Sequence, residues 1–159
     1  MKNIKKEIRY SQSSGDARVI LNTPIGKFIE YSYFNSEEDK GEPSEWIGCS
    51  IAEDRAMIDY TQAKIRLKRA EIKGLERFVK SYYKDPKTQA KAKNLLKAMN
   101  KELKDLIEER EEYRKNIKAA IKSRETYNRL KNIDRGARDA QMRFIQQGIA
   151  ALKSQDKTD

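Results

Sequence analysis

The sequence predicts an α+β fold that is mostly α: a small N-terminal antiparallel β-hairpin or meander packed on a long, coiled-coil-like antiparallel helical hairpin, with a C-terminal helix. Two observations of apolar spacing carry this prediction. The first is a series of branched residues that recur every seven positions: Ile51, Ile58, Ile65, Ile72 and Val79. The second is a longer apolar series after residue 86, whose steps alternate between three and four. Both have the period of a coiled-coil seam, which predicts two long helices.

The composition agrees with helix seams and a small sheet rather than a thick globular core. Of the 159 residues, 37% are hydrophobic and 38% are charged. Lys and Arg number 35 against 25 acids, and the net charge of +10 favours a negatively charged partner. The single cysteine, Cys49, excludes an intrachain disulfide and a zinc site built from several thiolates. The N-terminus lacks the apolar run of a signal peptide, and no segment has membrane-spanning length, so we expect a cytoplasmic protein with no membrane contact.

The N-terminal region reads as a small sheet. Residues 18–22 and 27–33 are rich in branched and aromatic types, which favours strands. Pro24 and Gly26 stand at the second and fourth positions of the turn between them, where a type I turn prefers these residues. This pattern predicts a hairpin, and residues 4–10 are a candidate third strand. A two-stranded hairpin is marginal alone, so we expect the sheet to pack on the helices.

An acidic linker is expected at 35–46, within a β region of 1–49. It contains five acids and one basic residue. Clustered carboxylates can bind calcium, but these lack the alternating oxygen ligands and the glycine of a helix-loop-helix calcium site. We therefore expect a solvated acidic loop. Trp46 and Ile47, at its end, are predicted to return to the core as anchors.

The helical hairpin is expected over 50–131. Ser50 and Glu53 fit a capping box, so the first helix should begin at Ser50 and end near residue 83. At 1.5 Å rise per residue, such a helix is roughly 50 Å long.

The second helix should begin at a turn near 84–86, with Asp85 as N-cap and Pro86 in the first helical position. So short a turn forces the two helices to be antiparallel, and residue i then lies opposite roughly residue 170 minus i. Arg110 and Arg124 occupy two of the expected apolar positions. The apolar series of this second helix is Ala92, Leu96, Met99, Leu103, Leu106, Tyr113, Ile117, Ala120 and Tyr127.

A third region, 132–159, is expected to hold the C-terminal helix and a frayed tail. The sequence of 132–136 suggests a break, with Asp134 as a new N-cap and Gly136 after it. The helix would then run over about 135–152.

The positive charge is concentrated near the hairpin turn. Residues 64–104 contain fourteen basic and four acidic side chains, a difference of +10, whereas residues 1–50 contain seven basic and eight acidic ones, a difference of −1. This excess predicts contact with phosphates or with an acidic protein surface. The candidate contact residues are Lys64, Lys68, Arg69, Lys73, Arg77, Lys80, Tyr83, Lys84, Lys87, Lys91, Lys93, Lys97 and Lys101.

A second apolar stripe of the first helix lies nearly opposite the isoleucine series. A helix that is apolar on two sides is sandwiched between partners, such as the sheet, the C-terminal helix or a second copy of the chain. The stripe is therefore a candidate oligomer face. Its members are Tyr60, Ala63, Leu67, Ala70 and Gly74.

The sequence lacks the residues that most catalytic sites use. There is no histidine, the commonest general base and metal ligand at neutral pH. Cys49 has no histidine to activate it; a helix N-terminus could lower its pKa, but a small buried residue is the simpler interpretation. The carboxylates of Glu108, Glu109, Glu111 and Glu112 are interpreted as a solvated acidic band. Residues 11–15 lack the Gly-Lys-Ser/Thr ending of a phosphate-binding loop. We therefore expect no enzyme, no cofactor and no bound metal.

Three functions from different classes remain. The first is a non-enzymatic binding protein whose basic hairpin contacts nucleic acid or a nucleoprotein complex. The second is a phage or mobile-element protein that binds and inhibits a host protein, for example a defence nuclease. The third is a structural or assembly protein that forms homodimers or larger homo-oligomers through its helices.

Overall fold

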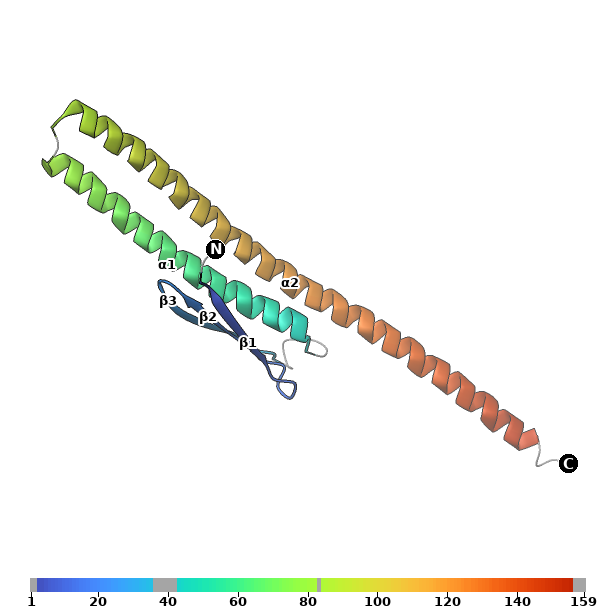
Figure 1. Ribbon diagram of the computed structural model, residues 1–159. Coiled ribbons are helices and arrows are strands. Elements are labelled where there is room, and N and C mark those ends of the chain that lie inside the picture. Colours follow the sequence, from blue (N-terminus) through green and yellow to red (C-terminus); the bar gives the residue numbers. More distant parts are fainter. Residues whose placement is uncertain (1–2, 36–42, 83, 156–159) are drawn as a thin grey trace. The chain divides into compact units, whose positions relative to one another are not determined.

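A computed structural model of the chain describes residues 3–35, 43–82 and 84–155. Three strands are followed by two helices (Figure 1), which confirms the α+β fold predicted from the sequence. Residues 36–42 of the expected acidic linker, and Tyr83 of the candidate contact residues, lie outside the described residues. The elements are β1 (Lys5–Tyr10), β2 (Ala17–Thr23), β3 (Gly26–Ser32), α1 (Glu45–Tyr82) and α2 (Pro86–Gln155).

The chain divides into two units. The first comprises Met1–Phe34 and Pro43–Ile121, and the second comprises Asn35–Glu42 and Lys122–Asp159. The first unit therefore holds the sheet, α1 and α2 as far as Ile121.

The sheet is an antiparallel meander in the order β1-β2-β3, so the candidate third strand is confirmed. Thr23 pairs with Gly26 across the predicted turn. The Thr23 hydroxyl Oγ1 donates to the Gly26 carbonyl oxygen at 2.7 Å, which closes the turn. Between β1 and β2, Gly15 has φ +77° and its Cα faces Pro43, so that a Cβ would lie 2.4 Å from the Pro43 Cβ. Glycine is therefore required in this loop.

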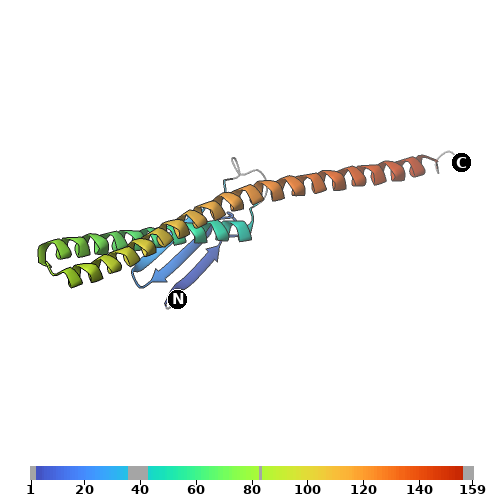
Figure 2. The ribbon, with the colours of Figure 1, turned by 90° about the horizontal axis from the view of Figure 1, so that it is seen from above.

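The core lies between β2 and α1. Alternate residues of β2 face the helix, and Ala17, Val19 and Leu21 pack with Ala52 and Ala56 of α1 in one buried cluster. The two alanines let the helix approach the sheet closely. The sheet covers one side of the N-terminal half of α1, and α2 runs along another side (Figures 1 and 2), so this half of α1 is sandwiched as its two apolar stripes predict. As far as Ile121, each element packs against the next one in the chain.

The start of α1 differs from the prediction. The helix begins at Glu45 rather than at Ser50, because Ser44 is the N-cap: its Oγ accepts a hydrogen bond from the Ile47 amide at 3.4 Å. Ile47 is buried, as predicted, but Trp46 is 74% exposed, so its predicted role as a core anchor is wrong. Successive helical residues point about 100° apart, so only one of the two can face the sheet.

The start of α2 is as predicted. Asp85 caps the helix, and its Oδ2 accepts hydrogen bonds from the Thr88 amide at 3.0 Å and from the Thr88 hydroxyl at 2.9 Å. These bonds stabilise the carboxylate and lower the pKa of Asp85, with the hydroxyl bond as the largest cause. Pro86 is the first residue of the helix.

The predicted break at 132–136 is wrong, because α2 continues without interruption to Gln155. The residues of the expected C-terminal helix are helical, but they form the last part of α2. No proline follows Pro86. A single Gly136 inside a helix costs only about 1 kcal/mol relative to alanine, which is too little to end it.

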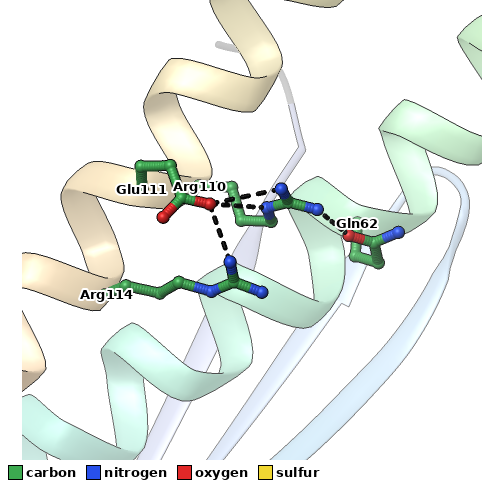
Figure 3. Close-up of polar contacts among 4 residues, drawn as sticks. All are labelled: Gln62, Arg110, Glu111 and Arg114. Atoms are coloured by element: carbon green, nitrogen blue, oxygen red, sulfur yellow. Dashed lines mark hydrogen bonds and ion pairs between the residues drawn. The ribbon is translucent and has the colours of Figure 1, made fainter.

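Polar contacts between α1 and α2 confirm the predicted pairing. Residues in contact should have numbers that sum to about 170. Lys68 and Glu102 sum to 170, with Nζ and Oε2 2.8 Å apart. Gln62 and Arg110 sum to 172 and share a hydrogen bond, drawn in Figure 3. Ile51, Ile65 and Ile72 of the isoleucine series are buried, as expected of residues in a helix seam.

Candidate functional site

Ten basic side chains near the hairpin turn are exposed, and we call them the basic tip. None of them forms an ion pair with another described residue. They come from the C-terminal end of α1, the turn and the N-terminal end of α2. The basic tip comprises Arg69, Lys73, Arg77, Lys80, Lys84, Lys87, Lys91, Lys93, Lys97 and Lys101.

The acids in this part of the hairpin are already engaged elsewhere. Glu71 and Glu102 both pair with Lys68, at 3.0 and 2.8 Å. The carboxylate of Asp85 is used to cap α2. Of the four acids, only Glu76 has no such partner among the described residues. The cations of the basic tip therefore outnumber the acids of this part of the hairpin and are not paired with them.

Two predicted contact residues do not belong to the basic tip. Lys64 lies with its Nζ 3.4 Å from Glu109 of α2 and 4.7 Å from the ring centroid of Tyr60. Lys68 bridges Glu71 and Glu102, and hydrogen bonds to these carboxylates, with Glu102 first, raise the pKa of its ammonium group. Both lysines hold the helices together and are only partly exposed. The sequence around these lysines does not indicate the ion pairs between the helices, because Glu109 and Glu102 lie on α2.

The length of the basic tip suits an extended polyanion. From Arg69 to Tyr82, α1 rises about 20 Å at 1.5 Å per residue. A nucleic-acid strand in a duplex advances 3.4 Å per nucleotide, so about six phosphates of one strand span the same distance. The lysines of α2 cover a similar length in the opposite direction.

No protein-family model, no curated protein and no solved structure matches this chain.

No helix among the described residues combines the length and the apolar character that crossing a bilayer demands.

The sheet covers only one end of the candidate oligomer face. Tyr60 contacts Phe28 of β3, with ring centroids 5.6 Å apart, so this end of the stripe packs against the sheet. Leu67 and Gly74 lie further along the same line and are exposed. A Cβ at Gly74 would meet nothing within 4 Å. The stripe is therefore a core contact at one end and an open surface at the other.

The four glutamates at 108–112 of α2 form ion pairs rather than a separate acidic site. Glu108 pairs with Lys104, and Glu109 with Lys64 of α1. Glu111 and Glu112 pair with basic residues of α2 itself: Arg110, Arg114 and Lys115.

Cys49 is a partly buried residue beside the core cluster. Burial, and then the charges of Glu45 and Glu53, raise the pKa of its thiol. The alternative of a thiol activated by the helix N-terminus is therefore contradicted, because burial and two carboxylates oppose ionisation.

The outer face of the sheet carries side chains that were not singled out in the sequence. Arg18, Tyr31 and Tyr33 lie there together. The alternation of residues between the two faces of a strand identifies this group: Ala17, Val19 and Leu21 face the helix, so Arg18 and its row face outward.

Proposed function

We propose that this protein is a non-enzymatic nucleic-acid-binding protein whose basic tip contacts phosphates, either of free nucleic acid or of a nucleoprotein complex. One observation supports it above all: ten exposed cations lie at one end of a helical hairpin, where three of the four acids are engaged in ion pairs or a helix cap. A cytoplasmic location, expected from the sequence, is part of the proposal.

The physical basis is the release of counterions. Each phosphate that a Lys or Arg neutralises frees a condensed cation, and the affinity then falls with salt by a slope of about 0.9 per contact. Only the side chains on one side of the basic tip can meet a single duplex. We therefore expect about five contacts, and a loss of roughly two to three orders of magnitude in affinity between 50 and 200 mM salt.

The test is a fluorescence-anisotropy titration with a labelled duplex at several salt concentrations. The test variant reverses Lys91, Lys93 and Lys97 to Glu. A matched variant reverses Lys104, Lys115 and Lys118, which are exposed on the same helix outside the basic tip. Both variants change the net charge equally. Binding should be lost in the first and largely kept in the second.

Equal losses in both variants would mean that only net charge matters, and the basic tip would then have no special role. Binding that ignores salt, or no binding at all, would remove the proposal. In that case an acidic protein partner, such as a host enzyme that the chain inhibits, becomes the better explanation of the same surface. It should be captured from nuclease-treated lysate by the wild type and not by the Lys91, Lys93 and Lys97 variant.

A further inference from the structure

The outer face of the sheet is an open surface in the first unit. Val19 and its alternate neighbours in β2 point to α1, so Arg18 and Ile20 point to the opposite face. Among the described elements, α1 is the helix that packs on the sheet, and it does so on the inner face. Ile20, at the centre of this face between Glu7 and Ile29, is only 7% exposed.

Two tyrosines on this face form an aromatic platform. The rings of Tyr31 and Tyr33 stack with centroids 5.6 Å apart and an interplanar angle of 7°. Tyr31 is 36% exposed and Tyr33 is 65% exposed, so the outer ring keeps a free surface. The guanidinium carbon of Arg18 lies 5.8 Å from the centroid of Tyr31 and supports the stack as a cation–π partner.

Positive charge predominates on the face that carries the platform. The pairing of the strands places Arg9 and Arg18 in one row with Tyr31, and Lys5 and Lys27 in another row of the same face. One acid, Glu7, lies between these rows and is paired with Arg9. The net charge of the outer face is therefore positive.

We propose that the outer face of the sheet binds single-stranded nucleic acid by stacking an unpaired base on Tyr33 while the cations of the same face hold the backbone. This rests on the proposed function, to which it adds the class of nucleic acid. Stacked exposed aromatics in a basic setting are the two components of a single-strand site. A base inside a duplex is already stacked on both faces and cannot stack on Tyr33 as well. Stacking on Tyr33 therefore favours single strands over duplexes, whereas phosphate contacts alone would not separate the two in this way. Because every base has a flat face, little sequence preference is expected.

The experiment compares two labelled ligands by fluorescence anisotropy: an oligothymidine of about twenty nucleotides, longer than a typical single-strand site, and a duplex of the same length. The variants are Tyr33→Ala, Tyr33→Phe, which keeps the ring, and Trp46→Ala. Trp46 is a matched control, because it is also a highly exposed aromatic but lies at the start of α1. Thermal melts confirm that each variant is folded.

We expect Tyr33→Ala to weaken oligothymidine binding by about fivefold to a hundredfold, the usual range for one stacked base. Duplex binding through the basic tip should change by less than about twofold, since phosphate contacts do not involve this ring. Tyr33→Phe and Trp46→Ala should bind oligothymidine as the wild type does.

Two results separate the proposals. If the wild type binds the duplex in a salt-dependent manner but Tyr33→Ala binds oligothymidine unchanged, the stacking site is wrong and the basic tip stands. If the wild type binds neither ligand, both proposals fall. An equal loss for both ligands in Tyr33→Ala would also overturn the stacking site, since it would assign Tyr33 to general phosphate binding or to folding.

Discussion

Arg110 of α2 donates a hydrogen bond from Nη1 to Oε1 of Gln62 on α1, with the two atoms 2.5 Å apart. The same guanidinium donates from Nε and Nη2 to Oε1 of Glu111, at 3.3 and 3.2 Å (Figure 3). Arg110 occupies a position where the seam pattern calls for an apolar residue, and only 18% of its side chain is exposed. A polar pair at such a position favours one alignment of the two helices over shifted ones.

The first prediction concerns this pair. Gln62→Leu should lower the free energy of unfolding by about 1.5–3 kcal/mol, because it leaves the mostly buried guanidinium of Arg110 without one of its acceptors. Gln62→Leu combined with Arg110→Leu should recover most of the loss, since apolar replacements of both members of a buried polar pair are often neutral or stabilising. Urea denaturation of the single and double variants measures both effects. An additive, larger loss in the double variant would show that the pair is not coupled.

Thr61 carries the second prediction. Its side chain is fully buried, and its hydroxyl has no hydrogen-bond partner among the described residues. Thr61→Val keeps the shape and removes the unsatisfied hydroxyl, so the free energy of unfolding should rise by about 1 kcal/mol. Thr61→Ser keeps the hydroxyl but loses a methyl group, and should lower it by about 1 kcal/mol. A loss of stability in Thr61→Val would indicate that the hydroxyl is satisfied in solution.

The third prediction tests the seam. Ile65 is fully buried, so Ile65→Ala should cost about 2–5 kcal/mol in unfolding free energy. Leu67 is the control two residues away, because it is exposed on the open end of the second stripe. Leu67→Ala should cost less than about 1 kcal/mol, as exposed positions usually do. Equal losses at both positions would mean that the second stripe is covered as well, for instance by a second copy of the chain; light scattering at high concentration would detect that dimer.

The fourth prediction concerns pH. Burial, and then a hydrogen bond with Asp59 and the charge of that residue, raise the pKa of Glu30 above its ordinary value of 4.5, while a backbone hydrogen bond from Tyr31 and the charge of Arg55 oppose them. The folded state therefore holds the proton more tightly than the unfolded state. By linkage, the contribution of Glu30 to stability is fully present when the pH is below the ordinary pKa of 4.5. It is lost as the pH rises through the pKa that Glu30 has in the folded state.

Glu30→Gln removes this titration, so it should raise the melting temperature more at pH 7 than at pH 4. Thermal melts of the wild type and the variant at both values measure it. Glu76→Gln, at an exposed carboxylate on α1, controls for the general loss of a charge. A shift of equal size at the two pH values would contradict the assignment.

Much of the first unit follows from local chemistry. Asp85 and Pro86 identify the turn because capping and proline geometry act within one helical turn. The heptad series then determines which residues of the two helices meet, and Lys68 with Glu102 confirms it. The strands were equally evident, because Pro24 and Gly26 mark the turn between them.

The errors have physical causes as well. Ser44 and Ser50 are both acceptable N-caps, and the helix uses the earlier one, which brings Ile47 into its first turn at a buried position. The prediction of a break around Gly136 gave too much weight to the low helix propensity of glycine, which is a small effect. Lys64 was assigned to the contact surface because its carboxylate partner, Glu109, is distant in the sequence.

Because each element as far as Ile121 docks on the one made just before it, the order of assembly can follow the order of synthesis. The three strands would be complete before α1 leaves the ribosome. Helix α1 would then pack on the sheet, and α2 would pack along α1, starting from the turn at Asp85. Each of these elements then finds a partner that has already been made, so the nascent chain should expose its apolar stripes only briefly.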